Sequence, residues 1–295
     1  MSRSRMQIAK ADIVSHLDGL SSHVLKPKEI RAVLAEQRDF WRLAQNTTSA
    51  QFIGFLERHS KLKPYEFPFP QRGEKCYAWG EVPLLTILLS LKKGLHFSHY
   101  TAMRIQGLTE QLPKSVYLTD ERTTSHPIER EKLSQSGIDQ AYNHPIRISS
   151  NWVEYGEKKV YLLNGADTSH LGVVVQQATD DDGKEVSVRV TNVERTLIDA
   201  TVKPLYAGGV FEVAKAFALA SDQLSVNKLM PMLRKLDFAY PYHQAIGYYL
   251  ERAGYKSSQL DLVRRLPMEY DFYLAHEMGG ARYEPTWRLF VPNGF

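Results

Sequence analysis

Polar and cationic side chains of the kind that contact nucleic acid gather between residues 48 and 75. Hydroxyl and amide groups come first, at Thr48, Ser49 and Gln51, and such groups hydrogen-bond to base edges. Cations that can bind phosphates follow along the same stretch; they are Arg58, Lys61, Lys63, Arg72 and Lys75. This pattern predicts a surface for double-stranded DNA, with the first three residues near bases and the other five on phosphates.

The charge balance of the chain favours the same interpretation. Residues 1–75 contain 13 Lys+Arg and 8 Asp+Glu, whereas all 295 residues together carry a net charge of +4. The first quarter is therefore at +5 and the remainder at −1. A basic segment on a nearly neutral body is what a phosphate-facing module requires.

A second chemistry is suggested by Glu157 and Lys159, with Asp139 upstream. In metal-dependent nucleases, carboxylates hold the ion and a lysine assists the attacking water. The spacing is common by chance, and these charges fall in an expected turn between two strands. A solvated loop is the favoured interpretation, and a metal-dependent nuclease or other catalytic defence effector is the alternative.

Two histidines, His96 and His99, are three residues apart and could share one helix face, as metal ligands do. A third ligand is not near them in the sequence. The favoured interpretation is that Ser98 caps the following helix and that His99 makes structural hydrogen bonds. The sequence thus predicts no metal, no cofactor and no enzymatic activity.

The elements expected to position the residues between 48 and 75 follow a recognisable order. Helices are expected at 11–20 and 26–44, and a third opens at residues 47–49 with capping hydroxyl groups. Strands at 62–69 and 76–79 flank a Pro-Gln-Arg-Gly turn at 70–73. This order of three helices followed by a two-stranded ribbon predicts a winged helix-turn-helix over residues 1–82. Its last helix would enter the major groove.

The second region, residues 83–295, is expected to be a mixed sheet followed by helices, so that the whole chain is α+β. Strands are expected at 113–119, 146–153, 159–163, 171–175 and 185–190, and helices at 193–199, 211–220, 225–235 and 241–253. The polar stretch 120–144 is expected to be an exposed, mobile excursion.

The composition of the chain indicates its cellular compartment. The single cysteine, Cys76, allows no disulfide within the chain, and the polar N-terminus lacks the apolar core of a signal peptide. The longest apolar run, residues 82–91, is about half of what spans a bilayer. We therefore expect a cytoplasmic protein without a membrane partner.

Four segments together resemble the AbiEi family, which comprises antitoxins and transcriptional regulators of type IV toxin–antitoxin systems. They are GLHFSHYTAMRIQGL at 94–108, LPKSVYLT at 112–119, VTNVERTLIDATVKPLYAGG at 190–209 and YPYHQAIGYYLERAGY at 240–255. The Ser98-His99 pair combined with the core at 195–199 is the most specific feature. The ribbon departs from the family, because residues 76–79 replace the basic wing of shorter members.

The resemblance implies two roles. The N-terminal winged helix would bind inverted repeats in its own promoter and repress a phage-defence operon, and the remainder would oppose a nucleotidyltransferase-like toxin. Candidates for the partner-facing surface are Arg195, Asp199, Tyr242, His243 and Gln244.

For each of these candidates a structural role is the favoured alternative. Arg195 and Asp199 are four residues apart, which allows an ion pair in a buried network. The Tyr242–Gln244 cluster suits a half-buried helix start as well as an interface. A third hypothesis for the whole chain is a protein-interaction module without DNA binding.

Overall fold

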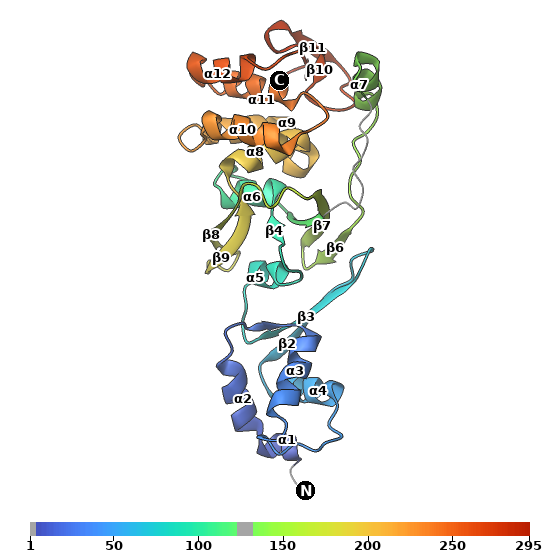
Figure 1. The fold of residues 1–295 in the computed structure, drawn as a ribbon, viewed down its shortest axis with the longest axis vertical. Coiled ribbons are helices and arrows are strands. Elements are labelled where there is room, and N and C mark those ends of the chain that lie inside the picture. Colours follow the sequence, from blue (N-terminus) through green and yellow to red (C-terminus); the bar gives the residue numbers. More distant parts are fainter. Residues whose placement is uncertain (1–3, 123–131) are drawn as a thin grey trace. The chain divides into compact units, whose positions relative to one another are not determined.

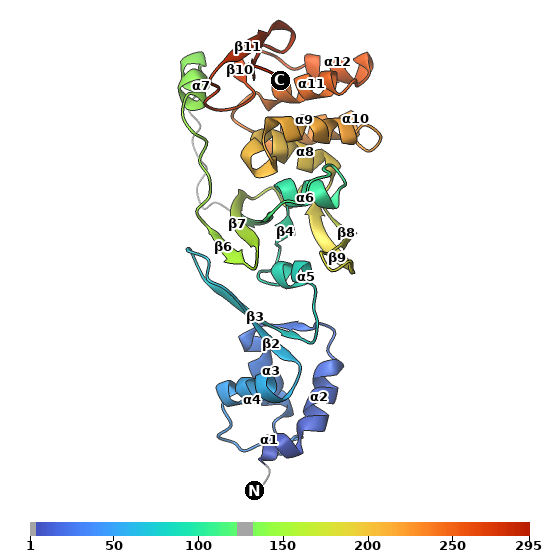
Figure 2. The ribbon, with the colours of Figure 1, turned by 180° about the vertical axis from the view of Figure 1, so that it is seen from behind.

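The computed structural model describes residues 4–122 and 132–295, and its fold is α+β, as predicted (Figures 1 and 2). The chain divides into two compact units. The first comprises residues 1–93 with 177–187, and the second comprises residues 94–176 with 188–295.

The first unit is a small helical core closed by a three-stranded sheet. Its helices are α1 (Arg5–Ile8), α2 (Lys10–Asp18), α3 (Pro27–Gln37), α4 (Ser49–His59) and α5 (Leu84–Leu89). Its strands are β1 (Val24–Leu25), β2 (Leu62–Phe67) and β3 (Glu74–Trp79), in the antiparallel order β1-β3-β2. The expected ribbon is therefore present, and residues 68–73 join its two strands.

Local chemistry explains where α4 begins and which face it buries. The hydroxyl of Thr48 accepts the Gln51 N–H, and the Gln51 side chain accepts the Thr48 N–H, which forms a capping box. Phe52, Phe55 and Leu56 then fall on one face and pack into the core of the unit. The opposite face of α4 is left to solvent.

The helix expected over 26–44 ends earlier, at Gln37. The guanidinium of Arg38 donates to the carbonyls of Ala44, Gln45 and Thr47, and so holds a compact loop before α4. Arg42 adopts a left-handed backbone (φ 50°) in this loop. As a result Phe40 lies outside the helix and is 73% exposed.

The second unit joins a six-stranded mixed sheet to a stack of helices. The sheet has the order β6-β7-β5-β4-β9-β8, in which β5·β7 and β4·β9 are parallel pairs. Its strands are β4 (His96–Phe97), β5 (Ser115–Arg122), β6 (Trp152–Tyr155), β7 (Lys158–Ala166), β8 (Val173–Thr179) and β9 (Glu185–Thr191). The end of the β8–β9 hairpin, residues 177–187, groups with the first unit.

The helices of the second unit lie to one side of this sheet, with α6 next to it and the others stacked beyond (Figure 1). They are α6 (His99–Ile105), α7 (Gln135–Tyr142), α8 (Val193–Val202), α9 (Val210–Leu219), α10 (Val226–Leu236), α11 (Tyr242–Arg252) and α12 (Ser257–Arg264). A small sheet of order β10-β12-β11 completes the unit, from β10 (Phe272–Tyr273), β11 (Ala281–Glu284) and β12 (Leu289–Pro292). Short 3₁₀ helices occupy Pro204–Ala207 and Pro285–Trp287.

The stretch 120–144 is only in part the excursion that its polarity predicted. Residues 120–122 extend β5, and α7 packs beside β10 with Ile138 and Tyr142 buried (Figure 2). The Gln135 side chain exchanges hydrogen bonds with the backbone of Asp271, which fixes α7 there. Residues 123–131 lie outside the described residues.

Among the described residues, no helix combines the length and apolar character that crossing a membrane requires.

Candidate functional sites

The residues proposed for base contacts lie at the start of α4. Thr48 and Gln51 are exposed and Ser49 is half-buried. Because the Gln51 Oε1 accepts the Thr48 N–H at 2.9 Å, its amide nitrogen is the end that can address a base. Arg58 is exposed in the last turn of α4, and its Nε donates to the Gly54 carbonyl at 2.8 Å.

The tip of the β2–β3 ribbon carries Arg72, whose side chain is 81% exposed and whose Nε lies 4.0 Å from the Glu74 carboxylate. The three lysines of this region are exposed too, and each is paired more closely with a carboxylate of the same unit. Lys61 contacts Asp18 at 2.8 Å, Lys75 contacts Glu66 at 2.6 Å, and Lys63 contacts Glu81. The lysines are evident in the sequence, but their carboxylate partners are not, because tertiary contacts and strand pairing bring the two together.

Hydrogen bonds in these pairs shift the pKa values of their members. The bond from Glu66 raises the pKa of Lys75, and the bond from Glu81 raises that of Lys63. The bond from Lys61, supported by the Trp79 indole N–H at 2.7 Å, lowers the pKa of Asp18. Lys63 and Lys75 therefore stay charged, and exposed pairs of this kind contribute little to stability and exchange partners readily.

Arg195 and Asp199, proposed for a partner surface, are instead buried on α8. The Arg195 Nε donates to Asp199 Oδ1 at 2.8 Å, which is the i,i+4 pair that the spacing allows. The Arg195 guanidinium also donates to the Leu171 carbonyl at 2.8 Å and to the Thr168 hydroxyl at 3.2 Å. This network holds the loop 167–172 against α8.

The other three partner candidates, at the start of α11, are divided between surface and core. Gln244 is fully buried, and its amide donates to the carbonyls of Tyr270, Trp287 and Arg288. Tyr242 and His243 are half-buried and line a cleft of about 240 Å³. Burial raises the pKa of Tyr242 to about 12 and lowers that of His243. Only Tyr242 and His243 of the five candidates are thus placed to meet a partner.

The nuclease pattern is not assembled. Glu157 is exposed in the β6–β7 turn, while Asp139 lies on α7, where it accepts hydrogen bonds from Gln135 and from the Tyr273 hydroxyl. Among the described residues, neither belongs to a group of side chains close enough to share an ion.

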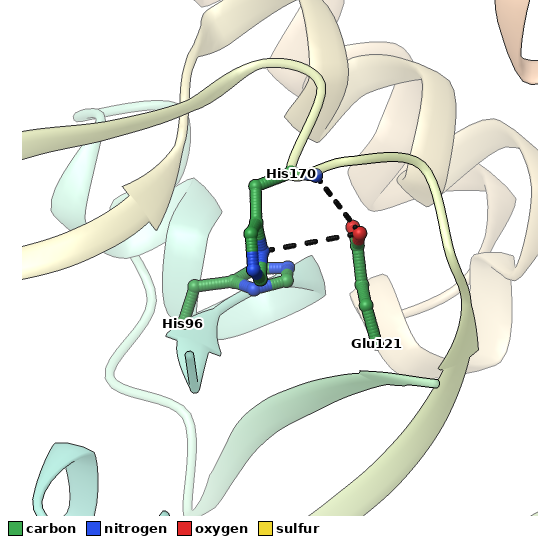
Figure 3. Close-up of side chains that lie close together, drawn as sticks. All are labelled: His96, Glu121 and His170. Carbon is green, nitrogen blue, oxygen red and sulfur yellow. Dashed lines mark hydrogen bonds and ion pairs between the residues drawn. The ribbon is translucent and has the colours of Figure 1, made fainter. Parts of the chain in front are cut away.

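Three other side chains do converge: His96 on β4, Glu121 near the end of β5 and His170 in the loop before β8 (Figure 3). Their nearest ligand atoms all lie within 4.8 Å of one another. The His170 Nδ1 is 3.8 Å from the Glu121 carboxylate, and the two imidazole rings meet edge to face with centroids 5.8 Å apart. The pairing of β4 with β5, which sets His96 opposite Thr119, brings two of the three together.

Glu121 is fixed by its surroundings. Its carboxylate accepts the backbone N–H groups of Thr168 and His170, both at 2.9 Å, and the Thr168 hydroxyl at 2.6 Å. Burial acts to raise the pKa of Glu121, but these hydrogen bonds prevail and hold it below its usual range. A carboxylate has about four acceptor sites, so three donors leave room for one more partner.

His96 is the unusual member. Its side chain is fully buried, and neither ring nitrogen has a hydrogen-bond partner among the described residues. Burial lowers its pKa to about 4, so the ring is neutral at pH 7. A buried polar group left unpaired costs about 1–3 kcal/mol, so such a group requires an explanation.

The histidine pairing that the sequence suggested is replaced by another. His99 turns away from His96 and bonds the Ser98 hydroxyl through Nδ1 at 2.9 Å, beside the rings of Tyr117 and Tyr206. The Ser98 hydroxyl does not cap α6, because it is shared between His99 and Thr119. Nothing in the sequence near His96 points to Glu121 or His170.

The chain matches no family model and no curated protein. It is similar to the crystal structure of the RV2827C protein from Mycobacterium tuberculosis, with a TM-score of 0.59 over 98% of this chain and 93% of that one. The sequences are 14% identical, so the likeness is one of fold. It extends over both units.

Proposed function

We propose that this protein is a DNA-binding transcriptional repressor that acts in the cytoplasm as the antitoxin of a type IV toxin–antitoxin operon. The observation that carries the DNA-binding part is the element order α2-β1-α3-α4-β2-β3 with sheet order β1-β3-β2. This is the order of a winged helix-turn-helix, in which the last helix enters the major groove and the ribbon follows the phosphates.

The two faces of α4 support its role as the recognition helix. One face is anchored by Phe52, Phe55 and Leu56, so the helix is held rigidly on the core. The other presents Gln51 near its N-terminus and Arg58 further along. Recognition helices contact base edges chiefly through their N-terminal residues, which assigns base contacts to Thr48, Ser49 and Gln51.

The cations of the ribbon supply the sequence-independent part of the affinity. The Arg72 side chain is 81% exposed, and its ion pair with Glu74 is long, at 4.0 Å, so its guanidinium can turn to a phosphate most readily. Lys61, Lys63 and Lys75 exchange a carboxylate for a phosphate on binding, so each contributes less than a free cation does. The proposal therefore includes a salt-dependent affinity, with Arg72 as its strongest single contact.

The antitoxin part rests on the resemblance of residues 94–119, 190–209 and 240–255 to the AbiEi family. In this proposal the second unit opposes a nucleotidyltransferase-like toxin. The half-exposed Tyr242 and His243 at the 240 Å³ cleft are the partner contacts that its geometry favours.

The first test is a gel shift with the duplex upstream of the gene and a scrambled duplex of equal length. We expect retardation of both at low salt and of the upstream duplex alone as salt is raised. The absence of retardation at low salt would refute the DNA-binding part, and cleavage of the duplex with added magnesium would favour the nuclease.

The second test is co-expression with the neighbouring gene. We expect the protein to restore growth when that gene is toxic, and Tyr242→Ala with His243→Ala to reduce the rescue. Stable co-purification with the neighbour in a protein without DNA affinity would instead select the interaction module.

A further inference from the structure

We propose that His96, Glu121 and His170 form a binding site for one divalent transition-metal ion of the zinc class. All three residues lie in the second unit, and the site is independent of the DNA-binding proposal. It departs from the sequence, which predicted no metal.

The donor set indicates the class of ion. Two imidazole nitrogens with one carboxylate oxygen suit zinc and its neighbours, whereas magnesium and calcium prefer oxygen donors alone. A zinc ion about 2.0–2.2 Å from each donor holds tetrahedral donors about 3.3–3.6 Å apart. The three ligand atoms lie within 4.8 Å of one another, so the half-exposed His170 side chain has to move toward the other two to close the site.

The buried His96 side chain is the main argument that this cluster binds an ion. Neither of its two ring nitrogens has a hydrogen-bond partner among the described residues, and one of them faces Glu121 and His170 (Figure 3). A metal bond satisfies that nitrogen in an environment where water is excluded from the ring. The cluster is therefore more than an accidental meeting of surface groups.

The surroundings already provide the outer contacts that metal ligands require. Backbone N–H groups and the Thr168 hydroxyl orient the Glu121 carboxylate, and Arg195 in turn holds Thr168. Such outer partners fix the direction of a ligand and strengthen the metal bond. The buried Arg195–Asp199 network thereby acquires a role as the support of this loop.

Three protein donors leave one tetrahedral position open. The His170 side chain is 39% exposed, so solvent reaches this side of the cluster. Water or an added ligand would fill the fourth position, as in zinc sites with three protein ligands.

The test uses the full-length chain without an affinity tag, freed of metal with a chelator and then titrated with Zn²⁺ and Co²⁺. We expect one ion per chain, a rise in thermal stability on adding Zn²⁺, and visible absorption of four-coordinate Co²⁺. The absence of a stoichiometric ion would refute the proposal.

The decisive variant is His170→Asn, because asparagine tolerates the left-handed backbone at this position (φ 55°) while the imidazole is lost. We expect it to lose the Co²⁺ spectrum and the zinc-induced stabilisation, with metal-free stability unchanged.

Glu121→Gln is the second variant, and Thr168→Val should weaken binding by about 10–100-fold through loss of carboxylate orientation. The matched control is His276→Ala, a half-buried histidine of the same unit outside the cluster. Equal binding by His170→Asn and the wild type would overturn the assignment.

Discussion

The α4–ribbon surface of the first unit and the His96–Glu121–His170 cluster of the second use charge in opposite ways. On the first, the cations are exposed and their carboxylate partners are exchangeable. In the second, the buried carboxylate of Glu121 is fixed by backbone N–H donors, and the neutral imidazole of His96 is buried away from water. The first arrangement suits a large polyanion that replaces many weak partners, and the second suits one small ion that needs fixed geometry.

The largest expected effect comes from a change at Gly172, the last residue of the loop 167–172 that carries His170. Its φ is +77°, and an added Cβ would lie 2.7 Å from the Arg195 Cβ. Gly172→Ala should therefore destabilise the protein by about 3 kcal/mol through strain and overpacking. DNA affinity of the folded protein should be unchanged.

The matched control is Gly254→Ala, which has the same φ with nothing within 4 Å of the added Cβ. Backbone strain alone should cost about 1 kcal/mol there. Equal losses in chemical denaturation of the two variants would show that the contact with Arg195 is unimportant.

The next effect is an acid sensitivity confined to the second unit. Burial lowers the pKa of His99 to about 4; Asp199 opposes this shift, and Arg195 and Lys203 add to it. Between pH 6.5 and 4 the unfolded chain binds a proton that the folded chain refuses, so stability is complete above pH 6.5 and falls below it. We expect Tm to fall by about 3–6 °C between pH 7 and pH 5.

Replacing His99 should remove part of this decrease in Tm. His99→Gln should reduce the difference in Tm between the two pH values, whereas His59→Gln, at an exposed position of α4, should leave it unchanged. An unaltered difference in the His99 variant would assign the acid sensitivity to other groups.

For the first unit, Arg72→Ala should weaken DNA binding by about fivefold and lower the salt slope by about 1, because one phosphate contact is lost. Fluorescence anisotropy at several salt concentrations measures both quantities. Lys235→Ala, which removes an exposed cation from α10, is the control and should behave as the wild type. Equal losses in both variants would indicate a general charge effect.

The smallest expected effect concerns the Glu66–Lys75 pair of the ribbon. Glu66 holds Lys75 across the ribbon at 2.6 Å, so Glu66→Gln should free that lysine and tighten DNA binding by about twofold. The gain should vanish when Lys75→Ala is added. A weaker complex in Glu66→Gln would mean that Lys75 does not meet DNA.

The first unit was largely predictable because its determinants are local. The hydroxyl-rich start of α4, the spacing of Phe52 and Leu56, and the turn before Gly73 are all short-range signals. What failed was the end of α3, where Arg38 binds carbonyls up to nine residues ahead, and the pairing of lysines with Asp18, Glu66 and Glu81. Those contacts depend on tertiary structure.

The cluster in the second unit could not be predicted, because its three residues are distributed over positions 96–170. The β4–β5 pairing and a left-handed loop at Ser169 and His170 bring them together. The sequence suggested His96 together with His99 as possible ligands and favoured no metal, whereas the structure places His96 beside Glu121 and His170. The buried Arg195–Asp199 pair was readable from its spacing, but its support of the loop was not.

The division of tasks between the two units is tested most directly by hydrogen exchange of the full chain, measured by mass spectrometry with upstream duplex DNA and, separately, with Zn²⁺. The account predicts that DNA protects residues 48–59 and 67–75, and that Zn²⁺ protects the segments around residues 96, 121 and 170. DNA protection that falls within residues 94–176 or 188–295 and spares α4 would contradict it.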